Sequence, residues 1–257
     1  MYLVWGSTYL AIAIAVQTLP PLLSAGARFL LAGALLGAWL LARHGRAALR
    51  IDRGQLGGAA LVGMLLLAGG NGLVVLAERT VPSGLTALVV ASVPLWIVVF
   101  RLSAGDRVAA SLVVGVLVGF AGVAILVVPR GASGEVDPLG LVTVVGATFS
   151  WALGTFASPR LPTPRDPLVS TAVQMLVGGA LLIVVALAIG EPARADPSSF
   201  SSASLVALAY LVVFGSLVAF SAYTWLLQHA PVSRVATYAY VNPVVAVLLG
   251  LWRSARP

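Results

Sequence analysis

Long apolar runs alternate with short polar groups along the whole of this chain. A helix needs about 20 mostly apolar residues to cross roughly 30 Å of hydrocarbon. Runs of that size, each closed by charged residues, proline or glycine, predict nine transmembrane spans: 2–19, 22–42, 55–77, 83–100, 108–128, 139–158, 167–189, 203–227 and 232–252. The longest connections, 43–54 and 190–202, are too short to form a separate soluble domain.

The spans are expected to be helices, so the predicted fold class is an all-α integral membrane protein. An unpaired backbone group in lipid costs several kcal/mol, and the alternating pattern of a membrane barrel is missing from the sequence. Because lipid does not drive helices together, small residues must let them pack closely. Such residues recur at four-residue spacing, as Gly33-x-x-x-Gly37, Gly54-x-x-x-Gly58, Gly115-x-x-x-Gly119 and Gly146-x-x-x-Ser150-x-x-x-Gly154. We expect them to join helices of one chain. A dimer interface is the alternative, so the protein is expected to be a monomer or a homodimer.

Composition agrees with a lipid environment. Hydrophobic residues make up 60% of the chain and charged residues 9%, and the mean hydropathy is +1.04. Soluble domains are about 45–50% apolar and about 25% charged. The chain has no cysteine, and its two histidines are far apart, so no metal site or cofactor is predicted. All 15 basic residues are arginines, most of them in short connections, where they set orientation and do not indicate nucleic-acid binding.

The positions of the arginines predict a cytoplasmic N-terminus. With that orientation the inside connections carry nine arginines: Arg43, Arg46, Arg50, Arg53, Arg101, Arg107, Arg160, Arg165 and Arg234. The outside connections carry three arginines and most of the acids: Arg79, Arg130 and Arg194, with Glu78, Glu135, Asp137, Glu191 and Asp196. An excess of arginine in short loops marks the cytoplasmic side of a membrane protein.

The second half of the sequence repeats the first. At an offset of 146, Trp5 aligns with Trp151, Pro21-Leu-Leu-Ser24 with Pro167-Leu-Val-Ser170, Leu30 with Leu176, and Gly33 with Gly179. At an offset of 149, Pro82 aligns with Pro231 and Pro94 with Pro243. Chance apolar similarity explains matched leucines, but it does not explain a tryptophan and three prolines in register.

A duplicated unit of five helices, an odd number, would enter the membrane from the opposite side in its second copy. Inverted repeats are typical of secondary transporters, in which one half rocks against the other around a site at the midplane. We therefore expect residues 1–130 to form one repeat, helices 1–5, and residues 138–257 the other, helices 6–9.

Five segments together resemble a known family: Trp5-Gly-Ser-Thr-Tyr-Leu-Ala-Ile12, Arg28-Phe-Leu-Leu-Ala-Gly33, Glu78-Arg-Thr-Val-Pro-Ser-Gly-Leu85, Gly119-Phe-Ala-Gly-Val-Ala124 and Val241-Asn-Pro-Val244. Over nearly its whole length the chain is similar to EamA-type permeases of the drug/metabolite transporter superfamily. The resemblance implies ten helices in two inverted five-helix repeats, cytoplasmic termini, and export of small metabolites or drugs across the bacterial cytoplasmic (inner) membrane. Only nine helices are predicted before Pro257, so the tenth is expected to be absent.

Arg28 and its repeat partner Gln174 are the first candidate site residues. Arg28 falls about 10 Å below the outer surface, where a charge costs about 2.5–3.5 kcal/mol on insertion scales and so indicates function by default. The alternative is structural, because an arginine can reach the interface from that depth.

Two intramembrane amides and two prolines form a second group. Asn71 and Asn242 must find polar partners, and Pro243 frees a backbone carbonyl one turn earlier. Ser92 and Pro94 are the matching feature in the first half. Pro94 and Pro243 are candidate hinges, and static kinks are the alternative.

Aromatic residues stand on the helices that the resemblance places around a central cavity, and they are candidates for binding the solute: Trp5, Trp151, Tyr223 and Tyr238, with Thr8 and Thr155 about one turn from the tryptophans. Such walls suit amphipathic or aromatic solutes, although tryptophan and tyrosine also populate membrane interfaces.

Glu78 is the only acid near membrane depth, and a solvated charge at a helix end is the alternative to a role in coupling. If protons drive transport, Glu78 or His229 is the candidate carrier, and facilitated diffusion or exchange is the alternative to proton coupling. An intramembrane enzyme would need paired acids, a Ser–His couple or metal ligands at membrane depth, and the sequence offers none, so a non-enzyme is predicted. The resemblance makes a multi-pass exporter, whose partners are the bilayer and a small solute, the preferred function. A truncated, transport-inactive family member is the alternative.

Overall fold

The computed structural model describes residues 1–46, 50–131 and 137–254, and every regular element in these ranges is helical. Glu135 and Arg256 lie outside them. The elements of residues 1–131, called here the first half, are α1 (Tyr2–Ala15), α2 (Pro21–His44), α3 (Arg53–Gly63), η2 (Met64–Gly72), α4 (Leu73–Ala77), α5 (Ser83–Val90), α6 (Val93–Ser103) and α7 (Ala110–Gly131). Those of residues 137–254, the second half, are α8 (Pro138–Ala157), η3 (Ser158–Arg160), α9 (Pro167–Ala188), η4 (Pro192–Arg194), η5 (Pro197–Ser199), α10 (Ser202–Tyr210), η6 (Leu211–Val218), α11 (Ala219–His229), α12 (Val232–Val235) and α13 (Tyr238–Ser254).

Six helices are long and apolar enough to cross a membrane: Pro21–His44, Arg53–Ala77, Leu85–Ser103, Pro138–Arg160, Pro167–Ala188 and Ser202–His229. Three shorter apolar helices accompany them in the described residues, Tyr2–Ala15, Ala110–Ile125 and Val232–Leu248. Large apolar side chains are exposed on the outside of the bundle, such as Val118 at 65% and Ile125 at 75%. An apolar exterior of this kind suits lipid and not water, so the predicted all-α membrane protein is confirmed in these terms.

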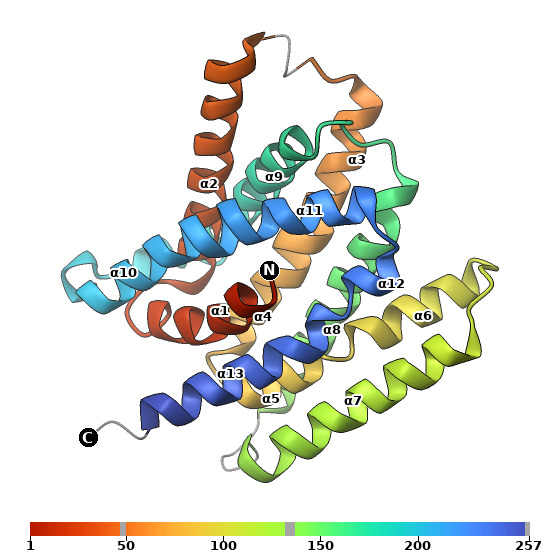
Figure 1. The fold of residues 1–257 in the computed structure, drawn as a ribbon. Coiled ribbons are helices and arrows are strands. Elements are labelled where there is room, and N and C mark those ends of the chain that lie inside the picture. The colour runs from red at the N-terminus through yellow and green to blue at the C-terminus, as the bar shows by residue number, and fades with distance from the viewer. Residues whose placement is uncertain (47–49, 132–136, 255–257) are drawn as a thin grey trace.

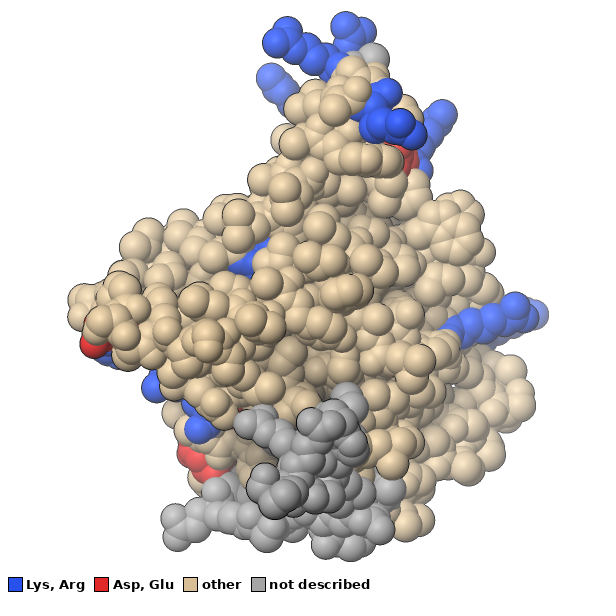
Figure 2. Space-filling view, turned by 60° about the vertical axis from the view of Figure 1, so that its left-hand side comes forward, with Lys and Arg blue, Asp and Glu red and all other residues tan. Residues whose placement is uncertain are grey.

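Arginines gather at one end of the molecule, where α2 ends and α3 begins, and the broad middle surface in that view carries almost no charge (Figure 2). Arg43, Arg46, Arg50 and Arg53 lie there and are exposed. The start of α3 is also fixed at this end, because Asp52 and Gln55 form a capping box.

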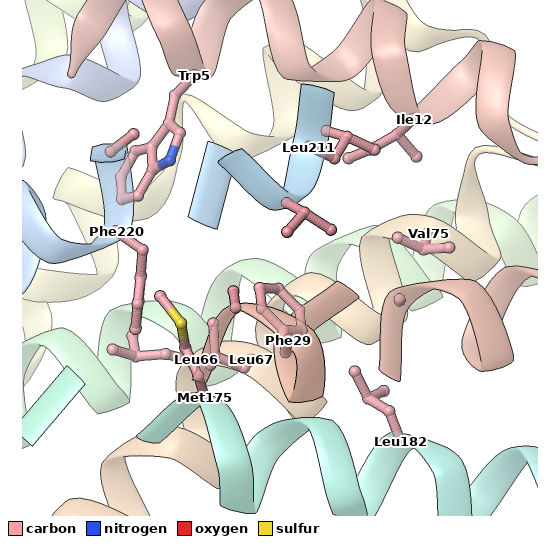
Figure 3. Packing of buried hydrophobic residues seen from close by; sticks show 14 of the residues in the cluster. Trp5, Ile12, Phe29, Leu66, Leu67, Val75, Met175, Leu182, Leu211 and Phe220 are labelled. Atoms are coloured by element: carbon pink, nitrogen blue, oxygen red, sulfur yellow. The ribbon is translucent and has the colours of Figure 1, made fainter. Parts of the chain in front are cut away.

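The centre of the bundle is built from elements of both halves. Figure 1 shows α1 between the continuous α10–α11 helix and α13, and α1 packs against α10 and α13. The largest apolar cluster joins α1, α2, η2, α9, η6 and α11, with Phe29, Leu66, Met175 and Phe220 almost completely buried (Figure 3).

Helices α2 and α9 pack along much of their length, and small residues make this possible. A Cβ atom added at Gly33 would lie 3.0 Å from side-chain atoms of Met175 and Leu176, and one added at Gly179 would lie 2.8 Å from the backbone nitrogen of Leu30. One added at Gly37, by contrast, would meet no atom within 4 Å. Of the predicted pair Gly33 and Gly37, only Gly33 therefore makes a close contact.

Candidate functional site

A partly open cavity lies between the two halves, with about 660 Å³ of space that includes space open to solvent. Residues of α1, α2, η2, α4, α5 and α6 line it from the first half, and residues of α8, η6, α11 and α13 line it from the second. Arg28 is the only charged residue among the described residues that line it.

Aromatic rings form one wall of this cavity. Trp5 on α1 packs edge-on against Trp151 on α8, with 5.6 Å between ring centroids, and against Tyr238 on α13, with 5.0 Å. Tyr223 on α11 contacts Trp5 at 4.9 Å and Trp151 at 5.6 Å, but it lies behind the wall, because it does not line the cavity. Phe29 and Phe220 complete the lining from α2 and α11. Four of the predicted aromatics are thus brought together from four helices.

Hydrogen bonds hold the aromatic rings of the wall in place. The indole nitrogen of Trp5 donates to the carbonyl oxygen of Gly215 at 3.3 Å, and the Thr8 hydroxyl donates to the carbonyl of Trp5 at 2.7 Å. Thr155 donates to the carbonyl of Trp151 at 2.8 Å and is also hydrogen-bonded to the Tyr223 hydroxyl. Thr8 lines the cavity and Thr155 does not. The wall is therefore held in a fixed shape before any solute arrives.

Arg28 lies at the cavity with only 3% of its surface exposed. Its Nε donates to the Ser216 hydroxyl of η6 at 2.8 Å, and its guanidinium lies 4.7 Å from the ring centroid of Phe29. Its repeat partner Gln174 is buried on α9, donates to the Ser170 hydroxyl at 2.9 Å and does not line the cavity. The predicted polar pair is thus divided, with only its arginine facing the cavity.

The two amides differ in their partners. Asn71 on η2 lines the cavity, and its Oδ1 is buried without a hydrogen-bond partner in the described residues. Asn242 lines the cavity as well, and its amide nitrogen is assigned to the position 3.1 Å from the carbonyl oxygen of Tyr2 and 3.2 Å from that of Tyr238. Asn242 therefore ties the start of α1 to α13, whereas Asn71 has an acceptor to offer.

Four remaining candidates do not line the cavity. Ser92 stands next to Pro94 at the break between α5 and α6, with its hydroxyl 3.5 Å from that of the lining residue Thr148. Pro243 lies inside the continuous helix α13. Glu78 ends α4, and both of its carboxylate oxygens are buried without a partner in the described residues. These residues can act on the cavity only indirectly.

Two π-helical segments border the cavity and were not predicted. Met64–Gly72 interrupts the helix formed by α3 and α4, and Leu211–Val218 interrupts the helix formed by α10 and α11. Both contribute lining residues, and single π turns inside helices are frequent at functional sites. The runs Gly69-Gly-Asn-Gly72 and Gly215-Ser216 were the available signal, because clustered glycines inside an apolar span weaken regular helix.

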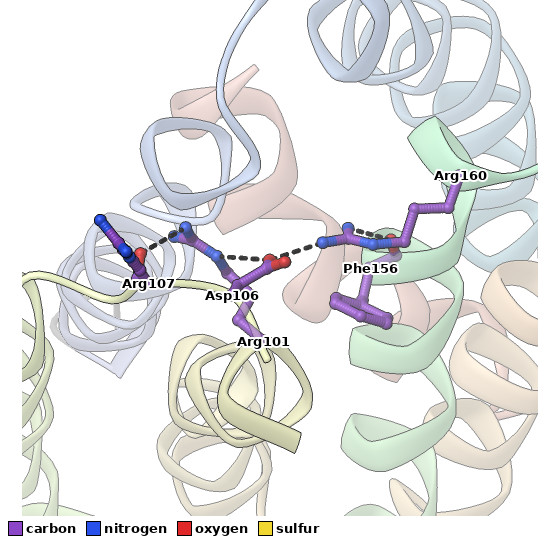
Figure 4. Close-up of polar contacts among 5 residues, drawn as sticks. All are labelled: Arg101, Asp106, Arg107, Phe156 and Arg160. Atoms are coloured by element: carbon purple, nitrogen blue, oxygen red, sulfur yellow. Dashed lines mark hydrogen bonds and ion pairs between the residues drawn. The ribbon is translucent and has the colours of Figure 1, made fainter. Parts of the chain in front are cut away.

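An exposed ionic cluster links the halves at another surface (Figure 4). Asp106, in the loop between α6 and α7, accepts from Arg160 of η3 at 2.6 Å and from Arg101 at 3.2 Å. Hydrogen bonding from Arg101, with Arg160 nearby, lowers the pKa of the Asp106 carboxyl. Arg160 also lies over the ring of Phe156, 3.9 Å from its centroid. At neutral pH the Asp106 carboxyl is therefore ionised.

The fold and the cavity define a polytopic helical membrane protein with a cavity between its halves, as membrane transporters have. Comparison with known proteins also points to membrane transporters. The EamA-like transporter family matches residues 1–128 and again residues 138–255. The chain belongs to this family.

Named relatives are transporters too. The chain is 42% identical over 252 residues to the uncharacterized inner membrane transporter YedA of Escherichia coli strain K12, covering 97% of this chain and 79% of the relative. It is 26% identical over 250 residues to the uncharacterized transporter YvbV of Bacillus subtilis strain 168, covering 96% of this chain and 79% of YvbV. A crystal structure 24% identical in sequence has the same fold, with a TM-score of 0.76 over all of this chain and 86% of that one. The family and these names support a transport role.

Proposed function

We propose that this chain exports small organic solutes, metabolites or drugs, across the bacterial inner membrane by alternating access of two inverted halves around the cavity. One observation carries the proposal. The cavity is bounded by both halves, and Trp5 and Trp151, which align in the internal repeat, meet in its wall with 5.6 Å between their rings. A site at the junction of two repeats is exposed to alternate sides when one repeat rocks against the other.

Reciprocal contacts support a two-fold relation between the halves. Gly33 packs on Leu176, and Gly179 packs on Leu30. These are one contact and its image, because Leu30 aligns with Leu176 and Gly33 with Gly179. Two copies related by a two-fold axis meet in this way, residue i on j and residue j on i. The odd number of spans in the first copy makes that relation an inversion.

The two π-helical segments repeat as well. Met64–Gly72 and Leu211–Val218 occupy matching places in the two halves, in the third span of each predicted repeat. Pro94 and Pro243 are proposed as hinges, since each stands in a helix that contributes to the cavity or its border. Repeat boundaries at 1–130 and 138–257 belong to the same proposal.

The proposed orientation of the chain in the membrane can be tested with single introduced cysteines, because the chain itself has no cysteine. Arg46→Cys and Ala193→Cys replace exposed residues in connections predicted to lie on opposite sides. A membrane-impermeant maleimide applied to intact cells should label Ala193→Cys and spare Arg46→Cys until the cells are lysed. Labelling of both positions in intact cells would contradict the proposed topology.

Transport is tested in inside-out and right-side-out vesicles with a labelled metabolite panel. Trp151→Ala should abolish movement of any solute that the wild-type chain carries, because it removes one side of the wall, while membrane insertion stays normal. Trp225→Ala is the matched control, since Trp225 is 49% exposed and lies outside the cavity lining. Wild-type rates in Trp151→Ala would refute this placement of the transport site, and net flux in the inward direction alone would refute export.

A further inference from the structure

Arg28 is a buried cation without a counter-ion in the described part of the chain. The ion pairs found there all involve Asp106, on a different surface of the protein. Arg28 is 3% exposed, and only its Nε has a hydrogen-bond acceptor, the Ser216 hydroxyl at 2.8 Å. A guanidinium has five N–H donors in a planar fork, so most of its donors are left over at the cavity.

The surrounding helices make room for this charge. A Cβ atom added at Gly215 would lie 2.9 Å from a terminal nitrogen of Arg28, so a larger residue in η6 would displace the guanidinium. Leaving a buried charge unpaired is unfavourable, and the planar Phe29 ring offsets only part of that cost. A bound oxyanion would complete the site, because carboxylates accept two parallel hydrogen bonds from a guanidinium.

The remaining lining of the cavity indicates the chemistry of the non-ionic part of such a ligand. The cavity has an aromatic lining made by Trp5, Trp151, Tyr238 and Phe220. The rings touch one another at 5.6 and 5.0 Å between centroids, so they form a filled wall and not an open cage for a cation. No acidic residue lines the cavity within the described residues, which removes the usual partner of a cationic drug.

Two buried polar atoms in the cavity lining specify further groups of the expected ligand. The indole nitrogen of Trp151 is buried without an acceptor, and Oδ1 of Asn71 is buried without a donor, again within the described residues. Both residues line the cavity. A ligand with an acceptor near the wall and a neutral donor near η2 would satisfy both atoms.

We infer that the solute is a small organic anion, whose carboxylate or other oxyanion pairs with Arg28 and whose aromatic or apolar body lies against the tryptophan wall. This inference rests on the proposed transport function and narrows its substrate class. It excludes cationic drugs from that class, because their charge would face a guanidinium with no acid to offset it.

Three probes with one body and different charge test the inference: 3-phenylpropionate, 3-phenylpropionamide and 3-phenylpropylamine. Purified protein in phosphatidylcholine nanodiscs is titrated with each probe, and the tryptophan fluorescence is followed. The carboxylate should bind at least about tenfold more tightly than the amide, as expected for a charge-assisted pair, and the amine should bind least. Trp151→Ala should lose this signal, and Trp225→Ala should retain it.

Arg28 variants identify the group responsible. Arg28→Gln should bring the carboxylate down to the affinity of the amide while leaving the amide unchanged, and Arg28→Lys should retain part of the preference. Glutamine is the residue at the aligned position 174, so that helix position accommodates it. Ser216→Ala, which removes only the Nε partner, covers the case in which Arg28→Gln does not fold, and it should weaken carboxylate binding alone.

The outcomes separate the two proposals. Saturable binding in which the amide or the amine equals the carboxylate would overturn the anion inference and leave the transport proposal standing. Failure of all three probes to bind the wild-type chain would count against the cavity as a solute site and so against both. A carboxylate preference that disappears in phosphatidylglycerol nanodiscs would assign Arg28 to a lipid headgroup and overturn the solute assignment.

Discussion

Replacing Glu191 with glutamine tests how the N-terminus of α2 is held. This helix starts after Pro20, which has no side-chain acceptor, and its free N–H groups are taken instead by a residue far away in sequence. The backbone nitrogens of Leu22 and Leu23 donate to the two carboxylate oxygens of Glu191 at 3.1 and 2.7 Å. Glu191 is only 8% exposed, so water cannot replace it without rearrangement.

The magnitude follows from these contacts. In Glu191→Gln one oxygen can still accept, while the amide nitrogen would face a second donor, so one charge-assisted hydrogen bond of about 1.5–3 kcal/mol is lost. The favourable interaction of the negative charge with the helix N-terminus, about 0.3–1 kcal/mol, disappears as well. The expected loss is about 2–4 kcal/mol, or a fall in apparent melting temperature of roughly 4–16 °C for a chain of this size.

The other half provides a matched control. Asp166 occupies the aligned position before α9 and caps that helix locally, accepting from the backbone nitrogen of Leu168 at 2.8 Å. Asp166 is exposed and asparagine caps equally well, so Asp166→Asn should change stability by less than about 0.5 kcal/mol. Both variants are compared by thermal unfolding in detergent, with Glu191→Ala as the larger perturbation. A Glu191→Gln protein as stable as Asp166→Asn would refute the assignment of Glu191 as the cap of α2.

Other predictions concern packing, pH and coupling. Gly63→Ala should destabilise the protein by about 1–3 kcal/mol, because its Cβ would lie 2.5 Å from a backbone oxygen of α9, whereas Gly37→Ala, with open space around it, should be neutral or stabilising in the same melting assay. The lowered pKa of Asp106 means that its ion pairs are complete above the ordinary carboxyl pKa and are lost only as pH falls through the lowered value. Any difference in transport rate between wild type and Asp106→Asn should therefore be constant from pH 8 to pH 5. A difference that vanishes within that range would contradict the lowered pKa of Asp106. Glu78→Gln should abolish accumulation driven by a proton gradient and spare counterflow exchange, because an unpartnered buried carboxylate is suited to bind a proton. Unchanged gradient-driven accumulation would exclude Glu78 from coupling.

The residues of the cavity were only partly predictable. Trp5, Thr8, Arg28, Asn71, Trp151, Tyr238 and Asn242 were candidates from the sequence and line the cavity. Tyr9, Phe29 and Phe220 also line it and were missed, because aromatic residues in an apolar span carry no mark of the direction in which they face. Ser216, which holds Arg28, was missed for a similar reason, since a serine among apolar residues is common in membrane helices.

Glu191 is the clearest example of a contact that the sequence could not predict. By position it is an acid in an outer connection, and nothing near it in sequence indicates a partner. Its two hydrogen bonds cross 169 and 168 residues to reach α2. The contact depends on how the second half packs on the first, which no local pattern encodes.

The sequence by itself determined the solvent, the element type and the family of this protein. Apolar runs of membrane length leave the backbone no partner except itself, and without the alternating pattern of a barrel these runs form helices. Tertiary structure decided which side chains share the cavity, why Arg28 faces it while Gln174 does not, and where helices widen into π turns. The physical reason is that in lipid every face of an apolar helix is almost equally acceptable, so rotation about the helix axis is set by small residues, hydrogen bonds and close packing between helices.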